Sequence, residues 1–152
     1  MRAEADTVWP VEISVGVQLV FVNAGPVTLD DRGDLVFPRL PAGPGVYRLE
    51  LRAADALQVY VGQAANLRRR AWDYRRPHPD NATSWRIREL LKGLLAAGGD
   101  VQMLVAELAQ IARGGVIVAL ELAGKTGKPG RMLAEHAALV AAVLDGDVVL
   151  NR

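Results

Sequence analysis

The stretch that decides the fold reads Gly45-Val46-Tyr47-Arg48-Leu49-Glu50-Leu51, followed closely by Leu57-Gln58-Val59-Tyr60-Val61-Gly62. Both runs are rich in the apolar, β-branched and aromatic residues that favour strands. Residues 52–56 between them are small or polar, which predicts two antiparallel strands joined by a turn. Because successive side chains of a strand alternate between its faces, Gly45, Tyr47 and Leu49 are expected on one face.

A helix is expected directly after the second strand. Gln63-Ala64-Ala65-Asn66-Leu67 leads into a segment that runs to Tyr74, and Asn66 is a suitable N-cap for it. Arg70 and Tyr74 are four residues apart and therefore share one side of this helix. A tyrosine in a sheet is usually a packing residue with a satisfied hydroxyl. Here two strand tyrosines and one arginine are placed so that they could converge on a phosphate group.

Positive charge is concentrated next to these residues. Between Gly62 and Lys92 there are eight basic and three acidic side chains, although the net charge of the 152-residue chain is only +1. Such a run is often just a solvated helix face, but beside a candidate phosphate site it favours a surface that binds a polyanion. Its aromatic residues Trp72, Tyr74 and Trp85 could stack on bases or pack in the core. The core is the preferred prediction, above all for Trp85.

Residues 1–42 are predicted to form a β-rich accessory segment before a main domain at 43–152. Strands are expected at 11–15 and 17–22, and a hairpin at 27–29 and 35–37. This segment is too small to hold much core by itself. It could extend the main sheet, shape access of the substrate, or mediate pairing of two chains, and the sequence does not choose among these.

The second half of the chain predicts further helices and strands. A helix is expected at 85–95, capped by Thr83 or Ser84, with five apolar residues facing the sheet: Ile87, Leu90, Leu91, Leu94 and Leu95. Strands are expected at 101–107 and 116–122, although 103–112 could also be read as a helix. A loop at 125–130 and a last helix at about 131–143 follow. The predicted fold class is therefore α+β, with a small, mostly antiparallel sheet flanked by helices and an N-terminal β-rich extension.

Composition excludes several classes of protein. The chain has no cysteine, so it has no disulfides, and its charged start does not resemble a signal peptide. Its apolar runs are interrupted well short of a membrane span, so no membrane association and a cytoplasmic location are expected. His78 and His136 have no partners at zinc-ligand spacing. Gly124-Lys125-Thr126-Gly127 lacks the spacing of a phosphate-binding loop and is interpreted as a surface turn.

The sequence resembles the GIY-YIG nuclease family over roughly residues 43–152. The residues that carry the resemblance are Gly45-Val46-Tyr47, Tyr60-Val61-Gly62, the link Gln63-Ala64-Ala65-Asn66-Leu67, and Arg70. The resemblance implies a β-β-α-α-β-α core with the two tripeptides on neighbouring strands and the arginine on the first helix. It also implies a tyrosine or histidine one turn later, which Tyr74 matches. A glutamate on a later helix and a closing asparagine are matched by Glu135 and Asn151.

The same resemblance implies a metal-dependent endonuclease that cuts DNA and leaves 3′-hydroxyl and 5′-phosphate ends. Glu135 would be the sole protein ligand of Mg²⁺ or Mn²⁺, with Glu107 and Glu121 as alternatives, and Arg70 would neutralise the phosphate. Either Tyr47 or Tyr60 would activate water, and Tyr74 would complete the hydrogen bonding to phosphate.

A second group of residues is expected to support the substrate: Gly45, Gly62, Arg68, Arg69 and Asn151. A catalytically silent DNA-binding or interaction module of the same fold is the alternative function. The oligomeric state, including a homodimer or a partner protein, stays open.

Overall fold

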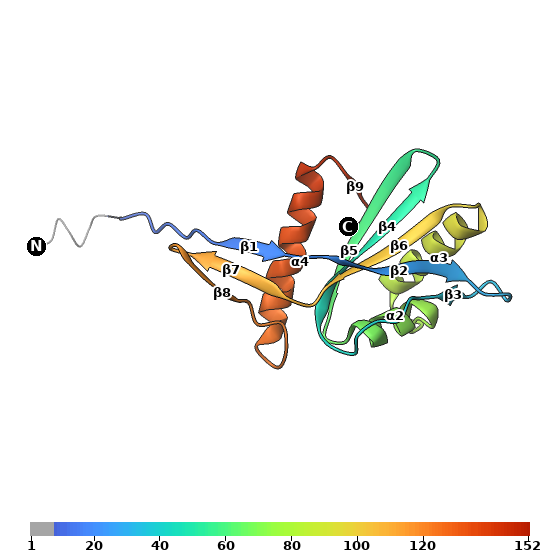
Figure 1. The fold of residues 1–152 in the computed structure, drawn as a ribbon, viewed down its shortest axis with the longest axis horizontal. Helices are drawn as coiled ribbons and strands as arrows, with labels where there is room; N and C mark the ends of the chain where they lie inside the picture. Colours follow the sequence, from blue (N-terminus) through green and yellow to red (C-terminus); the bar gives the residue numbers. More distant parts are fainter. Residues whose placement is uncertain (1–7) are drawn as a thin grey trace, which may run out of the picture.

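The computed structural model describes residues 8–152 (Figure 1). Residues 1–7, which include the charged start and part of the predicted accessory segment, lie outside the described residues. The elements within this range are β1 (Gly16–Leu19), β2 (Val22–Leu29), β3 (Leu35–Val36), β4 (Gly45–Ala53), β5 (Ala56–Ala64), α2 (Leu67–Arg75), α3 (Ala82–Ala96), β6 (Asp100–Ala106), β7 (Ala109–Arg113), β8 (Val116–Ala119), α4 (Gly127–Leu144) and β9 (Val148–Val149).

The predicted hairpin forms the centre of a six-stranded sheet in the order β3-β2-β6-β4-β5-β9. β4 and β5 are antiparallel, and Tyr47 lies opposite Gly62 while Leu49 lies opposite Tyr60. Only β9 is parallel to its neighbour. The strands are longer than predicted, because pairing continues to Ala53 and Ala56. The α+β fold class, with a mostly antiparallel sheet flanked by helices, is confirmed.

The N-terminal segment contributes strands to this sheet. β2 pairs with β6, and β3 pairs with β2, which confirms the hairpin expected at 27–29 and 35–37. The strand expected at 11–15 is absent, because these residues have no pairing partner in the described chain. The single strand expected at 17–22 is divided between β1 and β2 by two unpaired residues, Val20 and Phe21. Whether residues 1–42 act as an accessory segment stays a prediction.

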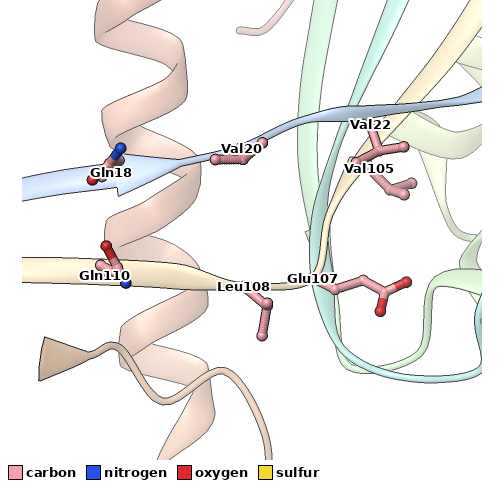
Figure 2. A pocket seen from close by; sticks show the side chains of 7 residues that line it. All are labelled: Gln18, Val20, Val22, Val105, Glu107, Leu108 and Gln110. Atoms are coloured by element: carbon pink, nitrogen blue, oxygen red, sulfur yellow. The ribbon is translucent and has the colours of Figure 1, made fainter.

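A second, three-stranded sheet in the order β1-β7-β8 stands beside the first. β1 is followed along the chain by β2, and β6 by β7. Because β1 pairs with β7 and β2 pairs with β6, these four strands form one two-stranded ribbon that runs through both sheets. The ribbon changes direction between the two strand pairs, near Val20 on one chain segment and Leu108 on the other (Figure 2). The alternative helix at 103–112 is therefore wrong, and the strand expected at 116–122 is shorter and belongs to this second sheet.

Two cores lie on opposite faces of the main sheet. Tyr47, Leu49 and Leu51 pack toward α2 and α3, as alternation along the strand predicts. Val46, Val59 and Val61 pack toward α4 instead. Central strands buried on both faces explain why the two quoted runs are so apolar. Within residues 8–152, no helix combines the length and the apolar character needed to cross a membrane.

α2 starts where it was expected, whereas α3 and α4 start earlier than predicted. Asn66 caps α2 as expected, by accepting a hydrogen bond from the backbone N–H of Arg69 at 3.0 Å. The cap of α3 is Asn81 and not Ser84 or Thr83, so this helix starts earlier than predicted. On α3, Leu90 is 38% exposed and does not face the sheet as predicted.

α4 starts at Gly127 rather than near 131. A side chain at Gly130 would overlap the backbone of Glu121, so glycine lets the first turn pack closely there. The segment Gly124–Thr126 before it is a turn, as predicted.

Candidate active site

Three predicted site residues are joined by hydrogen bonds between the sheet and α2. The hydroxyls of Tyr47 and Tyr74 are 2.6 Å apart. Arg70 donates from Nε to the Tyr47 hydroxyl at 3.2 Å and from Nη2 to the Tyr74 hydroxyl at 3.1 Å. Its Nη1 donates to Ser84 Oγ on α3 at 3.0 Å. The guanidinium also lies over the Tyr74 ring, 4.4 Å from its centroid. We call Tyr47, Arg70, Tyr74 and Ser84 the hydroxyl–arginine cluster.

Burial keeps the two phenols of this cluster protonated. The side chains of Tyr47 and Tyr74 are 1% and 0% exposed. Loss of solvation raises the pKa of Tyr47, although Arg70 acts in the opposite direction, and it raises the pKa of Tyr74 well above the usual value of 10. At neutral pH both are therefore hydrogen-bond donors rather than bases. One of the two hydroxyl protons lies in the hydrogen bond between the tyrosine oxygens. No residue in the range 8–152 accepts the second hydroxyl proton.

Arg70 has no carboxylate partner among residues 8–152. Burial alone would lower the pKa of Arg70, but its interactions with Tyr47 and Tyr74 outweigh this and raise it. A guanidinium has five N–H donors, and the cluster uses one on each nitrogen. One N–H on Nη1 and one on Nη2 are left. The arrangement presents a fixed cation with two donors to an anion.

Tyr60 lies beside the cluster but does not join its hydrogen bonds. Its ring centroid is 6.4 Å from that of Tyr47, and its side chain is 7% exposed. Its hydroxyl has no hydrogen-bond partner within the described part of the chain. Of the three phenols, Tyr60 is therefore the one free to bond with water or a ligand.

The two motif glycines make room for protein atoms. A Cβ at Gly62 would overlap the phenol ring of Tyr47, which lies across this position of β5. A Cβ at Gly45 would lie 2.8 Å from the carbonyl oxygen of Ala106 and from a methyl group of Leu67. Gly62 therefore allows Tyr47 to reach Arg70, and Gly45 allows α2 to start close to the sheet. A contact of either glycine with substrate stays a prediction.

Glu135 lies on α4 beside the end of β5. Burial raises the pKa of its carboxyl group, while His136 and the backbone amide of Gln63 lower it to a smaller extent. Gln63 directly follows Gly62, so the carboxylate is next to the second motif. The buried Arg131, one turn earlier on α4, donates from Nε to the Gln63 side chain at 2.8 Å. Arg131 and Gln63 thus fix α4 against the end of β5.

The two alternative metal ligands, Glu107 and Glu121, are both exposed, whereas Glu135 is half-buried. Glu107 is exposed at the junction of β6 and β7 (Figure 2). Glu121 is exposed, and its carboxylate accepts a hydrogen bond from the backbone of Ala123 at 3.1 Å. Within residues 8–152 there is no group of three or more histidine, cysteine or acidic side chains able to hold a metal ion. Of the three glutamates considered, Glu135 is the one whose carboxylate lies beside the residue that follows the second motif. Glu107 follows Ala106, which pairs with Val46 of the first motif, but its side chain is exposed. The helix that carries Glu135 packs on the face of the sheet opposite to the core that holds Tyr47 and Tyr74.

Asn151 supports β5 from its open edge. Its side chain accepts a hydrogen bond from the N–H of Val61 at 3.0 Å and donates one to the carbonyl of the same residue at 2.6 Å. Just beyond β9, the Asn151 amide thus makes the two hydrogen bonds to Val61 that a neighbouring strand would otherwise make. It thereby fixes the backbone of β5 between Tyr60 and Gly62. Its contact is with the sheet, and a contact with substrate stays a prediction.

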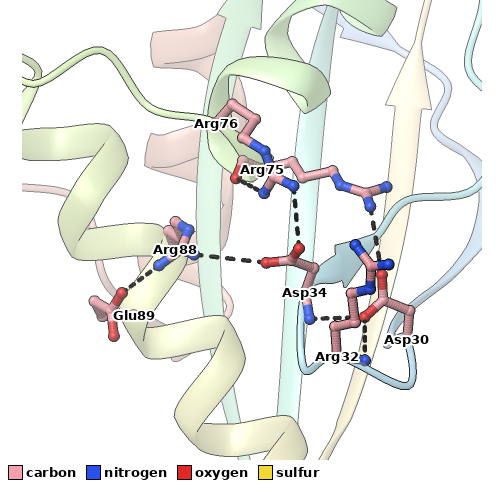
Figure 3. Close-up of polar contacts among 7 residues, drawn as sticks. All are labelled: Asp30, Arg32, Asp34, Arg75, Arg76, Arg88 and Glu89. Carbon is pink, nitrogen blue, oxygen red and sulfur yellow. Dashed lines mark hydrogen bonds and ion pairs between the residues drawn. The ribbon is translucent and has the colours of Figure 1, made fainter.

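Much of the expected basic surface is neutralised by the N-terminal hairpin. Arg75 pairs with Asp30 at 3.4 Å, and both Arg76 and Arg88 pair with Asp34, at 3.1 and 3.8 Å (Figure 3). The charge pattern along the chain does not reveal these pairs, because the acids come from a segment more than forty residues earlier. The patch that remains to bind a polyanion is smaller than the run of charges indicated.

The two other arginines that the sequence analysis selected lie outside the cluster. Arg68 donates from Nε to the carbonyl of Leu40 at 2.9 Å, so it fixes the start of α2. Arg69 is exposed, and its guanidinium has no partner within residues 8–152. Trp72 and Trp85 are 58% and 39% exposed, so the prediction that they pack in the core is wrong. Only Tyr74 of the three aromatic residues is buried.

No family model matches the sequence, and no curated protein is similar to it. Among solved structures, the fold is similar to that of a mutant of EndoII from bacteriophage T4. The TM-score is 0.53 at 18% sequence identity, over 82% of this chain and 88% of that chain. At this level of identity the similarity concerns the fold alone.

Proposed function

We propose that this chain is a metal-dependent endonuclease that hydrolyses DNA phosphodiester bonds at the hydroxyl–arginine cluster. At the level of the fold, a nuclease is supported by the likeness to phage T4 EndoII, a GIY-YIG-type nuclease. The observation that carries the proposal is Arg70, a half-buried cation that is held by three hydroxyls and by no carboxylate of residues 8–152. A cation kept in place without a counter-ion is a site for an external anion, and a guanidinium matches the geometry of phosphate through two parallel hydrogen bonds.

Arg70 would bind the scissile phosphate through the N–H groups left on Nη1 and Nη2. Because its other donors are fixed by Tyr47, Tyr74 and Ser84, little side-chain entropy is lost when the phosphate binds. The developing negative charge of the transition state would meet a preorganised cation. The remaining phenol proton of the Tyr47–Tyr74 pair would provide one further donor beside it.

Tyr60 is the better candidate for the tyrosine that contacts the attacking water. Its hydroxyl is the one without a protein partner, whereas Tyr47 is committed to Arg70 and Tyr74. The raised pKa of Tyr47 also opposes a role as a base near neutral pH. In this assignment Tyr60 orients water, and Tyr47 positions Arg70.

Glu135 would hold the divalent cation. A single carboxylate suits Mg²⁺, which keeps several of its waters and accepts few protein ligands. The site fits, since Glu135 is half-buried, has no ion-pair partner within residues 8–152, and lies beside Gln63 at the end of β5. The bound cation would supply Lewis acidity at the phosphate and leaving oxygen. Arg131 and Gln63 would keep the carboxylate in position by fixing α4 to the sheet.

The test is cleavage of supercoiled plasmid with Mg²⁺, with Mn²⁺, and with EDTA. The parent protein is expected to nick or linearise plasmid only with a metal ion. Glu135→Gln should lower the rate by roughly 10²-fold or more, the usual effect of losing a group that stabilises the transition state. Glu107→Gln, which removes an exposed glutamate at the β6–β7 junction, should cleave like the parent. Cleavage by Glu135→Gln at the parent rate would place the metal elsewhere.

The same proteins distinguish an enzyme from a silent module when DNA binding is measured separately by fluorescence anisotropy. A nuclease should bind DNA and cut it, with cutting lost in Glu135→Gln while binding is largely kept. If the parent binds plasmid and branched DNA but cuts neither with any metal, the interaction module is the correct function.

A further inference from the structure

The described chain begins with an extended segment that belongs to no helix or sheet. Residues 8–15 have no strand partner, and Figure 1 shows them running out beyond β1, away from the rest of the molecule. Their apolar side chains are exposed: Trp9 by 74%, Val11 by 85% and Ile13 by 81%. Exposed apolar residues gathered in one segment mark an interaction site more often than scattered single ones do.

This segment continues the apolar face of β1. Val17 and Leu19 of β1, together with Phe21 just after it, lie on the side of the strand that faces α4. Because strand side chains alternate, Val11, Ile13 and Val15 would lie on the same side if the strand continued toward the N-terminus. α4 covers Val17, Leu19 and Phe21. Val11 and Ile13 are 85% and 81% exposed, and Val15 is 42% exposed.

The free edge of β1 carries neither a charged residue nor a proline, although β1 itself is only four residues long. In the extended segment before it, Pro10 and Glu12 are the residues of these kinds. β1 is an outer strand of its sheet, and residues 13–22 contain no charged residue and no proline. Natural proteins blunt their exposed edges with lysine, proline, bulges or a covering element. An uncharged, β-favouring edge that is left bare is suited to accept another strand.

We propose that residues 9–21 pair antiparallel with the same residues of a second copy of this chain, around a twofold axis at Val15. In this register Val15 faces itself, Ile13 faces Val17, and Val11 faces Leu19, while Trp9 meets Phe21 at the ends. All these pairs share the face of α4. On the other face Glu12 lies opposite Gln18, so no like charges meet. The occupant is a second copy because the segment is complementary to itself, as a twofold interface requires.

A groove beside β1 provides the room that the second copy needs. A cavity of about 450 Å³ lies between β1 and α4, lined by Val17, Leu19 and Phe21 and by small residues of the helix such as Ala137 and Ala141. Pairing at the free edge places Val11 and Ile13 of the second copy on the face of this groove. The dimer joins the two three-stranded sheets into one and removes both bare edges.

Engineered cysteines test the register directly, because the chain has no cysteine of its own. Residues directly opposite in an antiparallel pair have Cα atoms about 4.5–5.5 Å apart, within the range of a disulfide. Val15→Cys should therefore form a disulfide-linked dimer under mild oxidation. The single variants Ile13→Cys and Val17→Cys should form a disulfide-linked dimer when the two proteins are mixed, because residue 13 of one copy lies opposite residue 17 of the other. Neither variant should cross-link by itself. Val118→Cys, which places an exposed cysteine on β8, is the control and should stay monomeric on a denaturing gel.

The mass in solution provides a second test that does not depend on cross-linking. Light scattering of the parent in the micromolar range should give twice the chain mass of 16.4 kDa. Ile13→Lys should give a monomer, and circular dichroism should show an intact fold because Ile13 is 81% exposed in the single chain. Ile117→Lys tests the exposed residues of β8 as an alternative interface, and this variant should stay dimeric.

Three results would overturn the inference: a monomeric parent, a dimer that survives Ile13→Lys, or a Val15→Cys variant that links no faster than Val118→Cys. The inference does not depend on the proposed function, since mass and cross-linking are measured without DNA or metal. A dimeric protein that cuts nothing would leave the inference standing and contradict the nuclease.

Discussion

Replacing Tyr74 by phenylalanine removes one oxygen atom from the hydroxyl–arginine cluster and leaves the ring in place. The ring keeps its contacts with Phe37 and with the guanidinium of Arg70. What is lost is the hydrogen bond with the Tyr47 hydroxyl and the hydrogen bond from Arg70 Nη2. The variant therefore measures how strongly these hydrogen bonds hold the cluster together.

The size of the effect follows from these two bonds. A neutral hydrogen bond contributes about 1 kcal/mol net, and one to a charged group about 1.5–3 kcal/mol. Arg70 is half-exposed, so water can replace part of the charged bond. We therefore expect the free energy of unfolding to fall by about 2–3 kcal/mol. For a domain of this length, that lowers the melting temperature by about 5–10 °C.

The assay is urea unfolding of the parent, Tyr74→Phe and Tyr60→Phe, followed by circular dichroism. Tyr60→Phe is the matched control, because its hydroxyl has no partner within residues 8–152; it should change stability by less than about 0.5 kcal/mol. Plasmid cleavage should nevertheless fall in Tyr60→Phe if this hydroxyl orients water. Equal stability of the parent and Tyr74→Phe would refute the reasoning, since the cluster would then not be held by its hydroxyls.

Three further predictions test the surroundings of the cluster. Because burial raises the pKa of Glu135, cleavage at a Mg²⁺ concentration below saturation should decline as the pH falls through a value above the usual 4.5, and saturating Mg²⁺ should move this decline to lower pH; pH–rate profiles at the two concentrations would show both. Gly62→Ala should displace the Tyr47 ring and lower both melting temperature and cleavage, whereas Gly43→Ala, with no atom within 4 Å of its added carbon, should change neither. The pKa of Asp34 is lowered, first by its hydrogen bond from Arg76, so its contribution to stability is present above pH 3.8 and is lost as the pH falls through the lower folded value. Asp34→Asn should therefore be less stable than the parent near neutral pH, with the difference shrinking in acid.

The parts of the structure that depend on neighbouring residues could be predicted from the sequence. The two strands, the Asn66 cap and the common side of Arg70 and Tyr74 follow from periods of two and of about four residues. These short-range rules were enough to bring Tyr47, Arg70 and Tyr74 to one place. Their chemical roles are still predictions.

The parts that depend on distant residues could not be predicted. β2 pairs with β6, whose residues come more than seventy positions later, and no local pattern selects that partner. Ser84 was interpreted as a cap because serine and asparagine are both good caps, but Asn81 takes that role. Ser84 is instead fully buried and holds Arg70, a role that only the packing of α3 against α2 reveals. The hydrogen bond between Arg131 and the Gln63 side chain could not be predicted for the same reason, because it joins residues 68 positions apart.

The central claim is that Arg70 is a fixed cation for a scissile phosphate, and single-turnover cleavage by Arg70→Lys tests it most directly. Lysine keeps the charge, but it has three N–H donors where arginine has five, and all three would be needed to replace the hydrogen bonds to Tyr47, Tyr74 and Ser84. No planar pair of donors would then remain for the phosphate. We predict a loss of roughly 10²-fold or more in rate, while Arg113→Lys, an exposed substitution on β7, cleaves like the parent. An Arg70→Lys variant that cuts DNA at the parent rate would contradict the account, because any positive charge would then serve in place of the arranged guanidinium.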